Sequence, residues 1–147
     1  MLRAELTIEI ARSADDVFGY LTDVDKLPEW QASVVSSRAN GPLEEGSRIV
    51  EQRALLGHEA ETELEVTSYE PARFFALRTI RGPVDLTIDH ELEEAKGETR
   101  LHVTATGKPG GLLRFAARAV EAKARHELRR DFERLKANLE RARTGPT

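Results

Sequence analysis

The sequence predicts an α+β protein, in which one antiparallel sheet has its apolar face covered by a long C-terminal helix. Most segments between residues 2 and 106 alternate apolar and polar side chains, which is the period of a strand with one buried face. Short turn signals such as Glu70-Pro71 and Gly82-Pro83 separate neighbouring segments, and such pairs favour tight hairpins. After residue 111 the apolar period lengthens to that of an amphipathic helix, and only this helix is large enough to cover the sheet.

The N-terminal part predicts one strand followed by two short helices. Residues 2–11 place their apolar side chains on one face, namely Leu2, Ala4, Leu6, Ile8 and Ile10. Ser13, with Asp16 three residues later, gives the pattern of a capping box, so a helix is expected to begin there. A second short helix is expected to end at Pro28.

Six more strands are expected, which gives a curved sheet of about seven. They cover residues 31–40, 48–56, 58–69, 72–81, 84–93 and 99–106. In the strands that alternate most clearly, the inward residues are Ala60, Thr62, Leu64, Val66, Val84, Leu86, Ile88, His90, Leu92, Leu101, Val103 and Ala105. The orientation of the strand at 48–56 is ambiguous. If Glu61 pairs with Arg53 on the outside, then Val50 and Gln52 point inward.

The pairing of these strands can be tested for consistency. Two-residue loops at Glu70-Pro71 and Gly82-Pro83 predict the pairs Thr62 with Thr79, Leu64 with Leu77, Glu63 with Arg78, Leu86 with Thr79, Ile88 with Leu77, and His90 with Phe75. Both hairpins therefore bring together the faces that the alternation marks as inward. A slip of one residue would turn every side chain over, so this agreement supports the inward set.

The last helix is expected from Leu112 to about Arg143, and its two halves differ. The C-terminal half carries one apolar stripe, made of Ala124, Leu128, Phe132, Leu135, Leu139 and Ala142. The N-terminal half has a broad face of mostly small residues, including Phe115, Ala116, Ala119 and Val120. Small side chains either let a helix approach a sheet closely or leave space for a ligand. The contrast between the halves favours a cavity beside Ala116, Ala119 and Val120.

The composition limits the classes of protein to which this chain can belong. The 147 residues are expected to form a single domain, 1–147, with a frayed tail at 143–147. There is no cysteine, which excludes disulfides and thiolate chemistry and fits a cytoplasmic protein. No apolar run approaches the ~20 residues of a membrane span, and the alternating, acid-containing N-terminus is unlike a signal peptide.

Charge is unevenly distributed. From Lys108 onward there are 11 Lys/Arg against 5 Asp/Glu, although the whole chain has a net charge of −4. A basic segment can indicate nucleic-acid binding. Here the basic residues are interleaved with acids and have no aromatic platform beside them. We therefore interpret them as the solvated face of a helix and expect no nucleic-acid partner.

Two stretches resemble a known superfamily. "DDVFGYLTDVDKLPEW" at residues 15–30 and "ELRRDFERLKANLE" at 127–140 resemble the opening motif and the last helix of the SRPBCC superfamily of START/Bet v 1-like and polyketide cyclase/dehydrase-like proteins. The resemblance extends from residue 2 to about 143, and the element order matches that family's helix-grip fold. Ser13-Ala14 stands where relatives often carry a proline, but the capping function survives.

The resemblance implies an internal pocket, with the curved sheet gripping the long helix. It also implies that Trp30, the only tryptophan, lies where the second short helix meets the second strand. We expect Trp30 to pack this corner, and the alternative is that it forms a wall of the pocket.

The sequence does not indicate a metal, cofactor or covalent site. His90 lies on the apolar face and His102 on the polar face, so they cannot form a cross-strand metal pair. Neither a Gly-rich phosphate loop nor a Gly-x-Ser-x-Gly motif is present. We therefore expect no cofactor and no metal.

His90 is the one inward residue with clear chemical potential, and three interpretations are open. It is a histidine satisfied by a neighbour, a ligand contact, or a general base, and the first is preferred. Thr62 and Thr79 could bind a ligand or each other. Arg81 could guard the mouth of the pocket or point to water, and water is preferred. Lys123 borders the inner stripe and is expected to extend outward to solvent.

The leading hypothesis is a binder of a small hydrophobic molecule, aromatic, polyketide-like or lipid-like, in a cavity between sheet and helix. The expected site residues are Trp30, Thr62, Leu64, Phe75, Leu77, Thr79, Arg81, Leu86, Ile88, His90, Phe115, Ala116, Ala119 and Val120. Alternatives are a cyclase- or dehydratase-like enzyme with His90 as the weak catalytic candidate, and a protein-interaction module that uses the basic helix. An exposed edge strand would also allow a homodimer.

Overall fold

The computed structural model describes residues 2–55, 57–82, 84–109 and 117–143. The elements are β1 (Leu2–Ile10), α1 (Ala14–Leu21), η1 (Val24–Lys26), α2 (Leu27–Trp30), β2 (Val34–Ala39), β3 (Arg48–Leu55), β4 (His58–Glu70), β5 (Phe74–Arg81), β6 (Val84–Ala95), β7 (Glu98–Pro109) and α3 (Ala117–Arg143). This confirms the α+β class, with two short α-helices after β1 and a long helix at the end. The expected start of the last helix at Leu112 and the tail after Arg143 lie outside the described residues.

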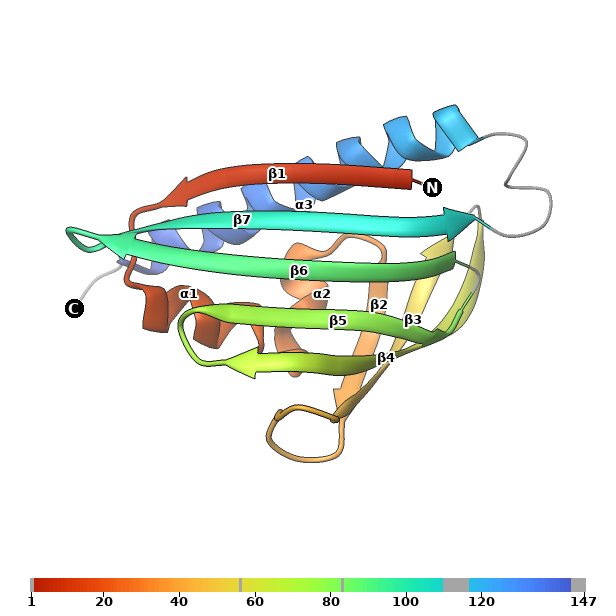
Figure 1. Cartoon of the computed structure of the whole chain (residues 1–147), viewed down its shortest axis with the longest axis horizontal. Helices are drawn as coiled ribbons and strands as arrows, with labels where there is room; N and C mark the ends of the chain where they lie inside the picture. The colour runs from red at the N-terminus through yellow and green to blue at the C-terminus, as the bar shows by residue number, and fades with distance from the viewer. Residues whose placement is uncertain (1, 56, 83, 110–116, 144–147) are drawn as a thin grey trace.

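The seven strands form one antiparallel sheet in the order β1-β7-β6-β5-β4-β3-β2. Figure 1 shows that the sheet curves, so that β2 and β3 lie behind β4 and β5, and that α3 crosses the concave side near β1. This is the helix-grip arrangement. Among the described helices, none combines the length and the apolar character that crossing a membrane requires.

The inward face that the alternation predicts is confirmed. The buried members of this face are Thr62, Leu64, Val66, His90, Leu92, Leu101 and Val103. The hairpin between β5 and β6 also has the expected register, with Ile88 opposite Leu77 and His90 opposite Phe75.

The expected register between β4 and β5 is wrong, by three residues next to the turn and by two residues beyond a bulge. Glu70 pairs with Phe74 across a three-residue loop, and Leu64 lies opposite Thr79 rather than Leu77. A three-residue loop alone would turn β5 over relative to the prediction. A bulge between Val66 and Ser68 turns it back, so the inward set survives the error.

The orientation of β3, which the sequence left ambiguous, is the opposite of the one that a Glu61–Arg53 pair would give. Arg53 pairs with Ala60, and Glu51 pairs with Thr62, so Glu51 and Arg53 point inward while Val50 and Gln52 point outward. The turn sets this register, because Leu55 pairs with His58 in a tight hairpin.

The helix boundaries follow local chemistry. Ser13 caps α1 as expected, since its hydroxyl accepts a hydrogen bond from the backbone N–H of Asp16 at 3.2 Å. The Asp16 carboxylate pairs with Arg12 at 3.0 Å. The second short helix does not end at Pro28. Pro28 lies in the first turn of α2, where the missing N–H has no helical partner, and α2 continues to Trp30.

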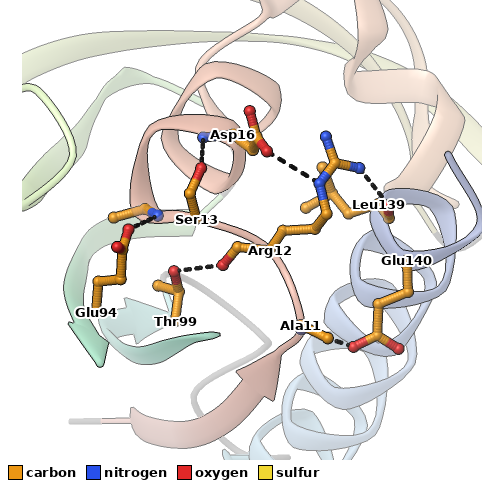
Figure 2. A network of polar contacts seen from close by, with 9 residues as sticks. Ala11, Arg12, Ser13, Asp16, Glu94, Thr99, Leu139 and Glu140 are labelled. Carbon is orange, nitrogen blue, oxygen red and sulfur yellow. Dashed lines mark hydrogen bonds and ion pairs between the residues drawn. The ribbon is translucent and has the colours of Figure 1, made fainter. Parts of the chain in front are cut away.

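A polar network fixes the β1–α1 junction against the end of α3 (Figure 2). The Ala11 N–H donates to Glu140 on α3 at 2.9 Å, and the Arg12 side chain donates to the carbonyl of Leu139. From the other side, the Thr99 hydroxyl donates to the Arg12 carbonyl at 2.8 Å. This network holds the C-terminal half of α3 near the sheet, where Phe132, Leu135 and Leu139 are buried.

Candidate functional site

A cavity of about 380 Å³ lies between the concave face of the sheet and α3. Strands β1 and β3 to β7 contribute to its wall, together with α2 and the stretch of α3 from Val120 to Phe132. Its apolar part includes Leu2, Ala4, Leu27, Trp30, Ile49, Leu64, Phe75, Leu77, Val84, Leu86, Ile88, Ala105, Val120, Ala124, Leu128 and Phe132. The bulky residues Phe132, Leu135 and Leu139 of α3 are buried, while the stretch that lines the cavity before them presents Val120, Ala124 and Leu128.

Most of the expected site residues line this cavity. They are Trp30, Thr62, Leu64, Phe75, Leu77, Thr79, Leu86, Ile88, His90 and Val120. Ala119 is not among the residues that line the cavity. Phe115 and Ala116 lie outside the described residues. The cavity expected beside Ala116, Ala119 and Val120 therefore lies beside Val120 but not beside Ala119, and Ala124 lines it as well.

Arg81 lies outside the cavity, on the outer face of the sheet. A second irregularity in the β4–β5 pairing, between Glu63 and Leu64, places Arg81 opposite Glu63. The two side chains pair at 3.0 Å, and the Arg81 side chain is 75% exposed. The expected inward position of Arg81 is therefore wrong, while the preferred interpretation, that it points to water, agrees with the structure.

Trp30 both packs the corner and borders the cavity. Its side chain is 2% exposed, and its ring meets that of Phe132 on α3 with centroids 5.0 Å apart. The same residue contributes to the cavity wall. Its indole N–H is buried and has no hydrogen-bond partner among the described residues. The two interpretations of Trp30 are therefore compatible.

His90 is a buried, neutral histidine. Its Nδ1 lies 2.9 Å from the carbonyl oxygen of Phe75. A carbonyl only accepts hydrogen bonds, so Nδ1 carries the proton and Nε2 keeps its lone pair. Burial lowers the pKa of His90 to about 4, against the opposing effect of the Phe75 hydrogen bond. The ring packs against those of Phe75 and Phe132, at centroid distances of 5.5 and 5.9 Å.

A polar cluster on β3 interrupts the apolar wall. The Glu51 side chain is 1% exposed and accepts a hydrogen bond from Arg53 Nε at 2.9 Å. The two terminal nitrogens of Arg53 donate to Ser33 Oγ at 2.8 Å and to Gln31 Oε1 at 2.7 Å. All four residues line the cavity. We name Gln31, Ser33, Glu51 and Arg53 the β3 cluster.

Asp131 brings a further carboxylate to the cavity from α3. It accepts a hydrogen bond from the backbone N–H of Ala32 at 3.2 Å, next to the β3 cluster. Burial raises the pKa of Asp131, and the hydrogen bond from Ala32 and the charges of Arg130 and Arg53 oppose this. Lys123 also lines the cavity but is mostly exposed and lies 3.9 Å from Glu127, as expected for a side chain that extends outward.

The sequence prediction missed the β3 cluster because charges hide the alternation of β3. Ile49, Glu51 and Arg53 share the inner face, so that face is not the more apolar one. The hairpin between β3 and β4 does predict the orientation of Glu51. A two-residue loop ending at Gly57 places Glu51 opposite Thr62, and the alternation of β4 places Thr62 on the inner face.

The arrangement can hold a mostly apolar molecule and make a few directed hydrogen bonds. His90 Nε2 offers an acceptor, the β3 cluster offers both donors and acceptors, and the rest of the wall is mainly aliphatic or aromatic. Within the described residues, no three His, Asp or Glu side chains gather as metal ligands do.

Three comparisons place this geometry among known proteins. A family model described as "Polyketide cyclase / dehydrase and lipid transport" matches residues 1–140. The fold is similar to a START superfamily protein from Mycobacterium smegmatis, with a TM-score of 0.82, 16% identity and coverage of 97% of this chain and 99% of that chain. No curated protein sequence matches the chain.

Aromatase/cyclases are also among the similar structures. The Zhui aromatase/cyclase from Streptomyces sp. R1128 has a TM-score of 0.79 and 17% identity, over 95% of this chain and 93% of that chain. The di-domain protein StfQ, from the steffimycin biosynthetic pathway, has a TM-score of 0.77 and 15% identity, over 98% of this chain and 53% of that chain. At these identities the likeness concerns the fold.

The depressed pKa of His90 predicts a specific pH dependence of stability. In the unfolded chain this histidine takes up its proton near pH 6.5, but in the folded protein only near pH 4. Its contribution to the free energy of unfolding is therefore complete above pH 6.5 and is lost as the pH falls toward 4, by about 3 kcal/mol in total. Urea unfolding at pH 7.5, 6 and 5 should show a steeper loss for the wild type than for His90→Gln.

The matched control is Leu92→Val, which removes buried volume from the same inward face of β6 but no titratable group. It should lower the free energy of unfolding by a similar amount at all three pH values and so keep the wild-type pH dependence. The same slope in His90→Gln and the wild type would contradict a neutral, buried His90.

Proposed function

This chain belongs to the polyketide cyclase / dehydrase and lipid transport family, and from this premise we propose that it binds a small hydrophobic molecule in the cavity between the sheet and α3. The observation that carries the proposal is the cavity itself, about 380 Å³ with a mainly apolar wall. Cavities that bind small molecules in proteins range from about 300 to 1,000 Å³ and combine apolar walls with a few polar groups.

Apolar burial would supply most of the binding free energy. Each Å² of apolar surface that leaves water contributes roughly 25 cal/mol, before the loss of freedom on association is subtracted. The walls that would provide this contact come from several strands and α3, so they are part of the protein core. The site therefore exists before the ligand arrives, which reduces the cost of ordering it.

A thermal unfolding panel tests this function. The panel contains phenols and other polyketide-like aromatics, fatty acids, fatty amides and sterols. A compound that binds only the folded state stabilises it by RT ln(1 + [L]/Kd), which is about 2.7 kcal/mol at 100-fold excess over Kd. We expect a saturable rise in melting temperature for at least one apolar class.

A variant with a filled cavity tests whether the rise in melting temperature comes from binding there. Ala105 lines the cavity, while its neighbour Thr104 has the opposite orientation on β7. Ala105→Phe should abolish the rise, and Thr104→Phe, which adds a similar ring on the other face, should keep it. No rise with any class, or an equal rise in both variants, would contradict binding in the cavity.

A cyclase- or dehydratase-like activity is a second candidate function. Two arguments favour it. With Nδ1 bonded to the Phe75 carbonyl, Nε2 is the nitrogen of His90 that can act as a base, and Asp131 and the β3 cluster add further polar groups to the same cavity. Proton transfer during cyclisation or dehydration needs more than one such group. A basic-helix protein interaction and a homodimer stay as predictions.

Turnover separates the second candidate from binding alone. With a poly-β-ketone analogue as substrate, His90→Gln should lose at least about 100-fold in kcat while the melting-temperature rise persists, because general acid–base catalysis contributes about that much. His102→Gln is the control and should keep wild-type turnover. Unchanged turnover in His90→Gln would reject this role for His90.

A further inference from the structure

We propose that the cavity selects uncharged ligands that carry a carbonyl, hydroxyl or amide group, and that it rejects carboxylates, because Glu51 already neutralises Arg53 in the β3 cluster. This inference rests on the proposed function and names the chemical class of the ligand. A hydrophobic cavity alone would accept two classes of ligand. The first class is neutral aromatic or lipid amides, alcohols and ketones, and the second is fatty or aromatic acids. The inference predicts that only the first class binds well.

The arginine that a carboxylate ligand would need is already occupied. Arg53 Nε is 2.9 Å from Glu51, and its terminal nitrogens are 2.8 and 2.7 Å from Ser33 and Gln31. Three nitrogens therefore have acceptors on three different residues. Such a guanidinium is held in place, and it cannot turn to form a two-pronged pair with an incoming carboxylate without losing these bonds.

The charges around the cavity also disfavour a second anion. Among the described residues that line it, four are acidic, Glu51, Glu121, Glu127 and Asp131, and three are basic, Arg3, Lys123 and Arg53. Each of these three basic side chains has a carboxylate within 4 Å: Glu5 for Arg3, Glu127 for Lys123 and Glu51 for Arg53. Glu121 and Asp131 also have arginines within 4 Å, namely Arg125 and Arg130, which do not line the cavity. The described lining therefore offers an incoming carboxylate no cation that lacks a carboxylate of its own.

Burial strengthens the repulsion between a ligand carboxylate and the acids beside it. The Glu51 side chain is 1% exposed and that of Asp131 is 14% exposed, so little water screens a ligand charge beside them. The raised pKa of Asp131 agrees with a site that penalises negative charge. An ionised ligand would also lose its own hydration on entering the cavity, without a cation to compensate it.

A neutral polar group finds partners in the same place. A guanidinium has five N–H donors, and the described structure occupies three of those of Arg53. The remaining donors can meet a carbonyl or hydroxyl oxygen, and the acceptors of Glu51 can meet an O–H or N–H. An amide or alcohol is therefore the type of head group that matches both halves of the pair.

Isosteric ligand pairs test the inference directly. We would measure Kd by calorimetry near pH 7.5 for 2-naphthamide against 2-naphthoate, and for decanamide against decanoate. Each pair has nearly the same shape, and only the second member is charged. We expect the amide to bind at least about tenfold more tightly, since opposing like charges cost a large free energy at a desolvated site. Equal affinity, or tighter binding of the acid, would overturn the inference.

A charge variant separates this selectivity from simple hydrophobic preference. Glu51→Gln keeps the shape of the side chain but leaves Arg53 without its counter-charge. The amide-to-acid ratio of affinities should then fall at least about tenfold. Glu61→Gln is the matched control, since Glu61 lies on the outer face of β4 and pairs with Arg38 at 3.9 Å. An apolar cavity without charge selection would give the same ratio in both variants and the wild type, which would overturn the inference.

The outcomes also distinguish this inference from the proposed function. Binding of both members with equal affinity contradicts only the charge selection. Binding of neither member of either pair overturns the inference alone, because the proposed function is contradicted only if the whole thermal unfolding panel also gives no rise in melting temperature. If Glu51→Gln does not fold, the wild-type comparison still decides, because the expected ratio does not depend on the variant.

Discussion

The structure depends on a mismatch in width between one sheet and one helix. Seven strands have six gaps of about 4.8 Å, so the sheet is roughly 29 Å wide, while a helix with its side chains measures about 10–12 Å across. The apolar face must be covered to be stable, and α3 can cover only part of it. The sheet responds by curving around the helix, and α1, η1 and α2 close one end. The remaining space is the cavity, so it follows directly from the architecture.

Side-chain size along α3 decides where this space lies. Phe132, Leu135 and Leu139 fill the gap at the C-terminal half, and the Ala11–Arg12 network ties that half to β1. Toward the N-terminal half the helix presents Val120 and Ala124 to the cavity. Trp30 stands at the boundary, where its ring packs against Phe132 and also borders the cavity. The packed core and the cavity are therefore two ends of the same interface.

The β3 cluster gives this interior its chemical character. A buried ion pair is weak evidence for stability, because the desolvation of two charges offsets most of their attraction. Glu51 and Arg53 nevertheless share the concave face, with Ser33 and Gln31 as further partners of Arg53. Their value under the present account lies in selection, because a compensated pair can bind neutral polar groups and still oppose an added charge.

The parts of this structure that the sequence predicted are those with a strict period. Alternation assigned the inner faces of β4, β6 and β7, and the inward His90 and Thr62 followed from it. The register between β4 and β5 was harder to predict. The three-residue loop after Glu70 turns the side chains of β5 to the other face of the sheet, and the bulge before Ser68 turns them back. A second irregularity moved Arg81 outward, and no residue pattern marks such a bulge. The β3 cluster was missed because its inner face carries charges, which an apolar pattern cannot detect.

The central claim, that a ligand occupies the cavity between sheet and helix, is tested most directly by NMR. Trp30 is the only tryptophan, so its indole N–H gives a single resonance from the cavity wall. On titration with a compound that raises the melting temperature, the account predicts large shifts for this resonance and for His90, and none for His102 on the outer face. Unchanged Trp30 and His90 signals, with shifts at His102 or along the exposed arginines of α3, would contradict it.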